Sequence, residues 1–206
     1  MTEVNRKIHV MGINSYIFED LPSKLQELFL NVYHLGNILE IGTYCGKSAL
    51  NFAKVAERKN RMVYTVDHHT GSEEHQLGEE YHDEKLFDER LNKFNTLPEF
   101  LNNLIFSKMG KCIVPIIAKS EKASKIFEEK IALLFIDGGH SLETAINDYE
   151  CWKNKICSGG LLVIHDVFPN PQDGGRPPFE IYSLAKESKE FKDHGIYETL
   201  GMLEKI

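Results

Sequence analysis

The sequence predicts an α/β fold with a mostly parallel sheet, and two observations support this prediction. Five short apolar runs alternate with longer segments, and a continuous apolar run is typical of a buried parallel strand. Three of these runs end in Asp, and a fourth ends at a glycine turn. Ligands of open parallel sheets bind outside the carboxyl ends of the strands, so these acids predict one shared site. The runs are Ile38–Gly42, Met62–Asp67, Cys112–Ala118, Ile131–Asp137 and Leu161–Asp166.

The segments around these runs predict helices from apolar residues at i, i+3 and i+4. The first covers Leu21–Leu35, with Asp20 as its candidate N-cap and Pro22 in its first turn. A second follows the turn at Gly42 and runs to about Arg58. The later helices are predicted at Ser120–Glu129, Ser141–Lys155 and Glu180–Lys189.

The remaining features complete a predicted sheet of seven strands. His194–Leu200 and Met202–Ile206 indicate an antiparallel C-terminal hairpin that turns around Gly201. Pro115 favours an edge position for its strand, because proline cannot donate to the ladder. The pair Gly159-Gly160 is expected to break the chain before the last parallel strand.

Residues 68–110 are too long for an ordinary connection between a strand and a helix. The stretch Asp67–Arg90 holds nine acids, four histidines and two basic residues. Helical spacing recurs in Leu86–Phe94 and Leu97–Met109. We interpret residues 68–110 as a lid or insertion over the strand ends, within a single domain that spans residues 1–206.

Composition excludes several classes of protein. The chain has 206 residues, is 42% hydrophobic and carries a net charge of −7, without a basic patch for nucleic acid. Its apolar runs fall far short of the roughly 20 residues of a membrane span, and the first ten residues lack a signal-peptide core. The four cysteines form no C-x-x-C pair. We expect a cytoplasmic protein without a membrane or nucleic-acid partner.

The turn after the first strand is typical of a nucleotide site. In residues 40–48 (EIGTYCGKS), Gly42 allows a sharp turn and Gly46 lets a ligand approach the backbone. Asp67, 25 residues after Gly42, is placed to accept ribose hydroxyls. The alternative is a tight turn with a solvated Asp. Tyr44 stands where a dinucleotide fingerprint needs glycine, and Ile41 where a P-loop needs one.

A second group of residues points to a metal or to catalysis. Asp137, His165 and Asp166 end neighbouring strands, although His165 alone also fits a hydrogen-bonded core histidine. Histidine as a residue type titrates near neutral pH, which suits a general base, and His140 lies three residues after Asp137; the alternative is that it caps the next helix with Ser141. The lid histidines fit either a functional site or a solvated acidic loop. These are His68, His69, His75 and His82.

Three blocks of this sequence resemble the class I S-adenosylmethionine-dependent methyltransferases. Glu40–Ser48 is similar to the metal-dependent catechol O-methyltransferase branch. Phe135–Ser141 (FIDGGHS) and Leu161–Phe168 (LLVIHDVF) also resemble the bacterial macrocin and cephalosporin tailoring methyltransferases. The resemblance covers roughly Leu35–Phe168. It implies a Rossmann-like, doubly wound fold with S-adenosyl-L-methionine and a divalent metal ion as cofactors.

The resemblance also implies roles for single residues. Asp67 would bind the ribose, Ser120 would lie near the adenine, and Asp137 would serve both cofactor and metal. The Asp-Asn pair of the catechol enzymes is here His165-Asp166, so the metal identity stays open. His140 stands where those enzymes carry their catalytic lysine. The cofactor-binding set implied is Glu40, Gly42, Thr43, Tyr44, Gly46, Ser48, Asp67, His68, Ser120 and Asp137.

The function predicted from the sequence is metal-dependent O-methylation of a small-molecule hydroxyl, with His140 as the base. A homodimer is an option, since dimers are common in the family that the chain resembles. Two alternatives remain open. One is a metal hydrolase on the same strand ends, and the other is a non-catalytic nucleotide-binding module. The acceptor and the role of the loop at residues 169–180 are also left open.

Overall fold

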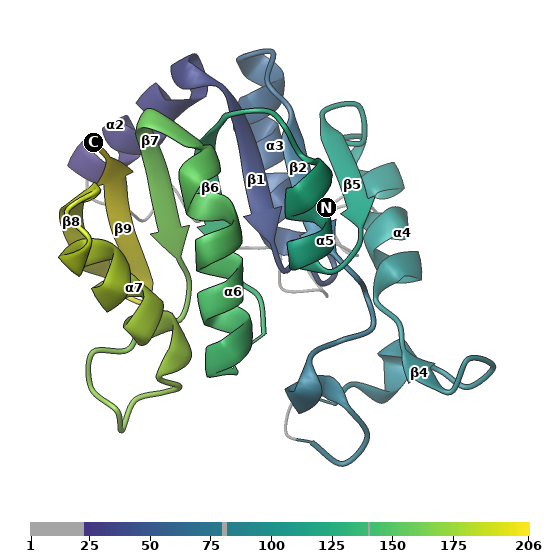
Figure 1. Ribbon diagram of the computed structural model, residues 1–206. Coiled ribbons are helices and arrows are strands. Elements are labelled where there is room, and N and C mark those ends of the chain that lie inside the picture. Colours follow the sequence, from purple (N-terminus) through teal and green to yellow (C-terminus); the bar gives the residue numbers. More distant parts are fainter. Residues whose placement is uncertain (1–22, 80–81, 140) are drawn as a thin grey trace.

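The computed structural model describes residues 23–79, 82–139 and 141–206, and these form a seven-stranded sheet in the order β5-β2-β1-β6-β7-β9-β8 (Figure 1). The parallel strands are β1 (Asn37–Ile41), β2 (Val63–Asp67), β5 (Ile113–Ile117), β6 (Ile131–Ile136) and β7 (Ile156–Ile164). The antiparallel strands are β8 (Phe191–Tyr197) and β9 (Leu200–Lys205). The predicted mostly parallel sheet with an antiparallel C-terminal hairpin is therefore confirmed.

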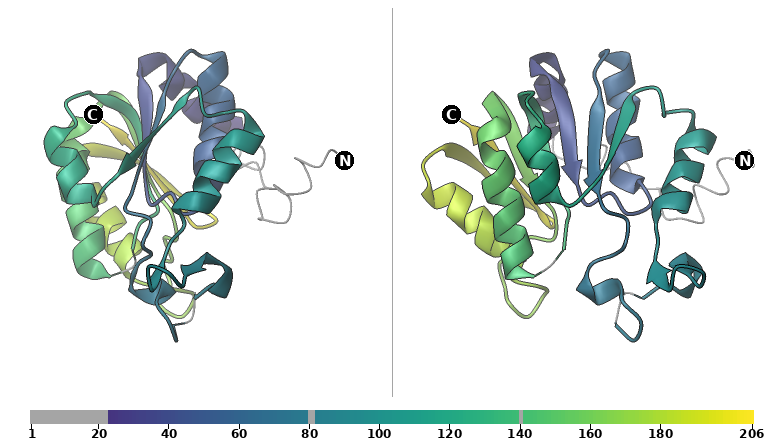
Figure 2. Two further views of the ribbon diagram at one scale, coloured as in Figure 1. Left: turned by 90° about the vertical axis from the view of Figure 1, so that its right-hand side faces the viewer. Right: turned by 45° about the vertical axis from the view of Figure 1, so that its right-hand side comes forward.

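Helices cover both faces of this sheet, as Figure 2 shows in the edge-on view. One layer is α2 (Ser23–Leu35), α3 (Lys47–Arg58) and α4 (Leu97–Ser107), and the other is α5 (Ser120–Ile126), α6 (Leu142–Trp152) and α7 (Pro177–Glu187). Successive strand residues face opposite layers. Ile38 packs with the first layer and Leu39 with the second. The doubly wound prediction is confirmed, while the proposed start of α2 at Asp20–Pro22 lies outside the described residues.

The segment after β2 leaves the sheet and lies beyond the carboxyl ends of the strands (Figure 1). It contains η1 (Glu73–His75), η2 (Glu84–Leu86) and a two-stranded ladder of β3 (Phe87–Asp88) and β4 (Lys93–Phe94). The helix predicted over 86–94 is wrong, because Phe87 pairs with Phe94 and Asp88 with Lys93 across this short hairpin. The helix predicted from Leu97 is confirmed as α4, whose Phe100 packs into the core.

Two predictions about glycines are wrong. Gly159-Gly160 does not break the chain but lies inside β7, where Gly159 adopts a left-handed φ of 77° and the register to β6 shifts. Likewise the C-terminal hairpin does not turn at Gly201, which pairs with Ile164 inside β9; it turns at residues 198–199. In both cases the glycine allows close packing within a strand instead of a turn.

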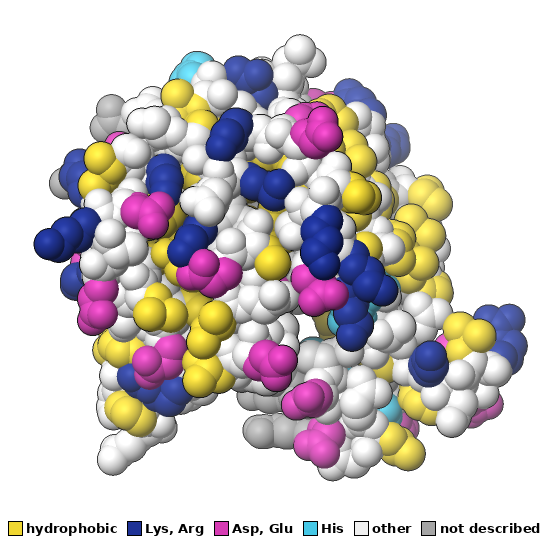
Figure 3. Space-filling view, viewed as in Figure 1, with side chains coloured by type: hydrophobic (Ala, Val, Ile, Leu, Met, Phe, Trp, Pro, Cys, Tyr) yellow, Lys and Arg dark blue, Asp and Glu magenta, His cyan; other side chains and the backbone are white. Residues whose placement is uncertain are grey.

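The edge position predicted for the proline strand is confirmed. Pro115 lies in β5, which pairs only with β2 among the described residues. Exposed apolar side chains gather on this side of the molecule (Figure 3), including Ile105 of α4 and Ile117 of β5. None of the helices within the described ranges is long and apolar enough to cross a membrane.

The closest backbone approach in the site region lies at Gly42. Its φ is 81°, and a Cβ there would lie 1.9 Å from the carbonyl oxygen of Asp137. The ends of β1 and β6 thus touch with no space for a side chain. This contact holds the two strand ends that carry the candidate site residues next to each other.

Replacing Gly42 by Ala should destabilise the protein by more than about 2 kcal/mol, since a left-handed φ alone costs about 1–3 kcal/mol and the overlap with Asp137 adds to it. Thermal or urea unfolding measures the change. Gly110→Ala is the matched control, because nothing lies within 4 Å of a Cβ at Gly110. Equal stability of the two variants would contradict the prediction.

Candidate active site at the carboxyl end of the sheet

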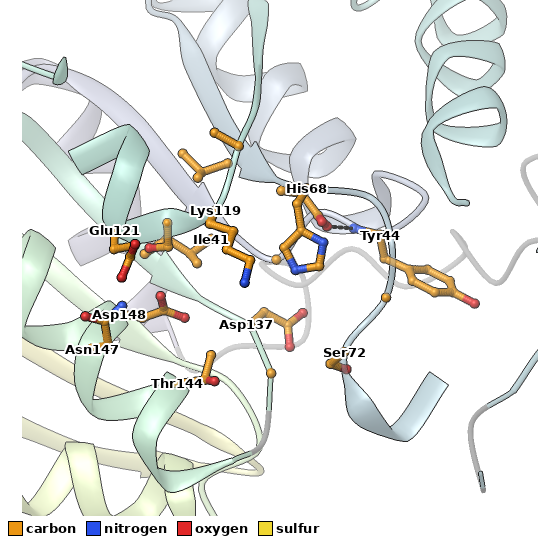
Figure 4. Close-up of a pocket in the computed structure, with 18 of the residues that line it drawn as sticks. Ile41, Tyr44, His68, Ser72, Lys119, Glu121, Asp137, Thr144, Asn147 and Asp148 are labelled. Carbon is orange, nitrogen blue, oxygen red and sulfur yellow. Dashed lines mark hydrogen bonds between the residues drawn. The ribbon is translucent and has the colours of Figure 1, made fainter. Parts of the chain in front are cut away.

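A cavity of about 450 Å³ opens at the carboxyl ends of β1, β2, β5 and β6 (Figure 4). This volume lies within the ordinary range of small-molecule sites. Six residues of the predicted cofactor set line it, namely Gly42, Tyr44, Asp67, His68, Ser120 and Asp137. The other four, which are Glu40, Thr43, Gly46 and Ser48, lie behind this wall.

Asp67, at the end of β2, organises the wall of the cavity. Its Oδ2 accepts backbone N–H groups from Thr43 at 2.8 Å and Tyr44 at 2.9 Å, and its Oδ1 accepts that of His69 at 2.7 Å. Hydrogen bonds to an ionised acceptor are stronger than neutral ones. Each carboxylate oxygen accepts more than one hydrogen bond, so Asp67 keeps capacity for a ligand hydroxyl.

The glycine turn leads directly into α3. Gly46 is the N-cap residue of α3 with a φ of 90°, and a Cβ there would lie 2.8 Å from the ring of Phe100. Tyr44 is also left-handed, with a φ of 51°, and is 40% exposed beside the cavity. The turn therefore needs Gly46 for its packing, while its Tyr44 side chain is presented outward.

Glu40 lies fully buried under this turn. Burial raises the pKa of its carboxyl to about 8; the hydroxyls of Ser48 and Thr43 lower the pKa, and the nearby carboxylates of Asp137 and Asp67 raise it further. Glu40 is thus a neutral acid over much of the physiological range, beside Ser48 of α3 and Thr43 of the turn.

The lid histidines do different things. His68 lines the cavity, and its Nδ1 lies 2.7 Å from the Thr70 hydroxyl. His69 is buried, with Nδ1 2.7 Å from the Thr96 hydroxyl and its ring stacked on Phe100. His69 is therefore a packed structural histidine.

His75 and His82 belong to an aromatic wall around Phe94. The centroid of the His75 ring lies 5.5 Å from that of Tyr44 and 5.2 Å from that of Phe94. The His82 ring lies 6.2 Å from Phe94. His75 also lies 2.7 Å from the hydroxyl of Ser72, and both residues line the cavity. The lid thus presents two histidines, His68 and His75, and the hydroxyl residues Ser72 and Thr96 to the cavity.

The far end of the cavity holds residues that the sequence interpretation missed. Lys119 and Glu121 follow β5, and Asn147 and Asp148 come from α6. A signal for Asp148 was present in the sequence. It occupies the buried stripe of α6 with Ala145 and Trp152, where an acid is unusual.

Asp137, His165 and Asp166 come together as predicted, with potential ligand atoms within 4.8 Å of one another. His165 Nδ1 lies 3.0 Å from Asp137 Oδ1 and 3.3 Å from Asp166 Oδ1. Asp166 adopts a left-handed φ of 54°, which Asp tolerates better than most residues. Burial lowers the pKa of His165, but the two carboxylates outweigh it and raise that pKa to about 10. The cluster attracts positive charge.

The charge around the cavity is mostly negative. Figure 3 shows Asp and Glu side chains gathered near the hollow between the body and the segment below it. Among the described lining residues, Lys119 is the only lysine or arginine, against five acids. The acids are Asp67, Glu121, Asp137, Glu143 and Asp148. His140, the predicted base, lies outside the described residues, so its role stays a prediction.

Comparison with solved structures gives the class of this fold. A methyltransferase from Podospora anserina with S-adenosylhomocysteine bound has a TM-score of 0.63 and 14% identity over 100% of this chain and 89% of that one. An O-methyltransferase from Bacillus cereus in complex with S-adenosylhomocysteine has a TM-score of 0.58 and 15% identity, over 98% of this chain and 89% of that one. The O-methyltransferase NovP has a TM-score of 0.63 and 15% identity, over 88% of this chain and 79% of that one. At such identities these likenesses establish the class I methyltransferase fold.

Residues 39–167 match the family model described as a methyltransferase domain. The chain belongs to this family. The predicted class, an S-adenosylmethionine-dependent methyltransferase, is confirmed at the level of family and fold. The matched region begins in β1 and ends just after Asp166, so it contains every residue of the predicted site.

The buried acid beneath the turn predicts a pH-dependent stability. The pKa of Glu40 is raised from 4.5 to about 8 in the folded chain, so its favourable contribution is complete below pH 4.5 and is lost as the pH rises to 8. Relative to Glu40→Gln, the wild-type chain should therefore lose about 1.4 kcal/mol of stability per pH unit over that range. Urea unfolding of both proteins from pH 5 to 9 measures this difference, and a constant difference would contradict it.

Proposed function

We propose that this chain transfers a methyl group from S-adenosyl-L-methionine to an oxygen of a small-molecule acceptor, with a divalent cation at Asp137, His165 and Asp166. Membership of the family establishes that the chain is a methyltransferase. The acceptor, the metal and the roles of the single residues are our proposal. The observation that carries it is the position of Asp137, which belongs both to the cavity wall and to the carboxylate–histidine cluster.

The cavity supports the cofactor part of the proposal. Asp67 has acceptor capacity for ribose hydroxyls, and the glycine turn places backbone groups beside it. The methionine end would then lie toward residues 42–46 and the adenine toward Ser120. The bound S-adenosylhomocysteine of the structural neighbours is consistent with this arrangement.

The donor set of the cluster fits a divalent cation. Two carboxylates and one imidazole suit Mn²⁺, Fe²⁺, Co²⁺ or Zn²⁺ better than Mg²⁺, which prefers oxygen ligands. The three side chains are 31–36% exposed, so an acceptor can reach them. A cation bound there lowers the pKa of a nearby hydroxyl by its charge. When no cation is bound, the carboxylates of Asp137 and Asp166 stabilise the protonated, positively charged form of His165 instead.

The chain's own residues then have three tasks. Asp67 and the turn position the methyl donor. Asp137 belongs to both the cavity wall and the cluster, so it places the acceptor next to the donor. Such positioning supplies much of the rate in a displacement of this kind. His140 takes the hydroxyl proton as the acceptor oxygen bonds to the methyl carbon, the bond from that carbon to the sulfonium sulfur breaks, and S-adenosylhomocysteine leaves with the electron pair. Within the predicted lid at residues 68–110, Ser72 lies against Gly139 and covers the cavity.

Replacing Asp67 by Asn should weaken binding of S-adenosylhomocysteine at least tenfold, because the ribose loses a charged acceptor. Titration calorimetry measures the affinity, and thermal unfolding shows that the variant is folded at the working temperature. Asp173→Asn, at an exposed residue of the loop before α7, is the matched control. Unchanged affinity in folded Asp67→Asn would remove the ribose assignment.

Replacing Asp166 by Asn should weaken binding of Mn²⁺ by at least tenfold and leave the affinity for S-adenosylhomocysteine within about threefold, because only the cluster loses a charge. Manganese titration followed by electron paramagnetic resonance measures the first quantity, and calorimetry the second. Asp173→Asn again serves as the control. If wild-type chain binds no Mn²⁺, Co²⁺ or Zn²⁺, the metal part of the proposal fails while the methyl-donor part stands.

The binding experiments also test the first alternative, because a metal hydrolase would bind the cation but not S-adenosylhomocysteine. A non-catalytic nucleotide-binding module would bind the nucleoside as the proposed enzyme does, and an assay for methylated product separates the two.

A further inference from the structure

The base of the lid contains a histidine and a threonine that have no role in the function proposed so far. His69 lies two residues after β2, and Thr96 is the N-cap residue of α4. Both are buried, with 2% and 1% of their surface exposed. The chain leaves the sheet after β2 and returns to it at α4 (Figure 1). These two residues therefore lie at the two ends of the segment that extends beyond the strands.

Two hydrogen bonds join these ends, although the residues lie 27 positions apart in the chain. The Thr96 backbone N–H donates to the carbonyl oxygen of His69 at 3.1 Å, and the Thr96 hydroxyl lies 2.7 Å from His69 Nδ1. Burial lowers the pKa of His69, and the Asp67 carboxylate raises it in part, so the ring is neutral at pH 7.5. We call this pair of hydrogen bonds the clasp.

The His69 ring connects the clasp to the glycine turn. It stacks on the ring of Phe100, with centroids 5.2 Å apart and an interplanar angle of 23°. The same Phe100 ring lies against Gly46, where a Cβ would approach it to 2.8 Å. The carbonyl oxygen of Thr96 accepts the Phe100 backbone N–H at 2.9 Å. The clasp and the turn after β1 are therefore packed on one aromatic side chain.

The backbone of His69 connects the clasp to Asp67. His69 has a left-handed φ of 58°, which is unfavourable for a residue with a side chain and persists only where the surroundings hold it. In this conformation its N–H reaches Asp67 Oδ1 at 2.7 Å. When the ring is released, the backbone can relax to a negative φ, and its N–H then turns away from the carboxylate. The clasp thus supports the orientation of the Asp67 side chain.

We propose that Thr96 and His69 are positioning residues, whose clasp holds both Asp67 and the lid residues of the cavity wall in the arrangement that binds the methyl donor. The inference rests on the proposed function, because that function assigns Asp67 to the donor. Ser72 and His75 belong to the same segment and line the cavity, so they lose their places when its ends separate. By linkage, binding of the donor in turn favours the clasped state.

Thr96→Val tests the clasp, because valine has nearly the shape of threonine but no hydroxyl. At pH 7.5, hydrogen exchange of residues 82–95 in the ligand-free chain should become at least about fivefold faster, while that of β6 stays unchanged. The affinity for S-adenosylhomocysteine, measured by titration calorimetry, should fall at least about fivefold. Thr96→Ser keeps the hydroxyl and should retain the wild-type exchange and affinity. A purely structural role for Thr96 would speed the exchange of β6 as well.

Thr70→Val is the matched control for the exchange measurement. The Thr70 hydroxyl also lies 2.7 Å from a histidine Nδ1, that of His68, but this pair is two residues apart and Thr70 is exposed. Its loss should leave the exchange of residues 82–95 unchanged. The wild-type chain gives a reading that needs no variant to fold, because bound S-adenosylhomocysteine should slow the exchange of residues 82–95. Equal exchange with and without the bound compound overturns the inference.

The outcomes separate this inference from the proposed function. Wild-type exchange and affinity in folded Thr96→Val overturn the inference and leave the proposed function standing. A fall in affinity without faster exchange also overturns it, since Thr96 would then act by contact with the ligand alone. A wild-type chain that binds no S-adenosylhomocysteine overturns the proposed function. The exchange of Thr96→Val against Thr96→Ser then still decides whether the clasp holds the lid.

Discussion

Three backbone N–H groups converge on the carboxylate of Asp67, and the shape of the site depends on them. Two come from the turn after β1 and one from the first residues of the segment after β2. One side chain therefore ties together two loops that would otherwise leave the sheet independently. Because charge-assisted hydrogen bonds are strong and directional, these contacts fix the turn against the end of β2.

The two helical layers contribute different parts of the site. The turn into α3 and the packing of Phe100 against Gly46 come from one face of the sheet. Ser120, Asn147 and Asp148 belong to α5 and α6 on the other face. The cavity lies where these faces meet at the strand ends, as is usual for doubly wound sheets. The cluster around His165 lies one strand further along, joined to the cavity through Asp137.

Much of this arrangement was predictable from the sequence because strands that end in acids leave a local signal. The five parallel strands, the edge position of Pro115 and the Asp137–His165–Asp166 cluster follow from apolar runs and their last residues. The hairpin at residues 87–94 was not predictable, since its apolar spacing fits a helix equally well. The glycines in β7 and β9 were misjudged because a bulge or a close contact depends on the neighbouring strand. Asp148 left a signal, an acid in the buried stripe of α6, but helical spacing alone does not tell that this stripe meets the cavity.

The contact between Gly42 and the carbonyl of Asp137 has a thermodynamic consequence. The backbone of Asp137 touches the turn, while its carboxylate lies 3.0 Å from His165, so one residue belongs to both halves of the site. A ligand that displaces Asp137 at one half changes the free energy of binding at the other. By linkage the effect is reciprocal, and the same factor applies in both directions. The order in which two ligands arrive then leaves the total binding free energy unchanged.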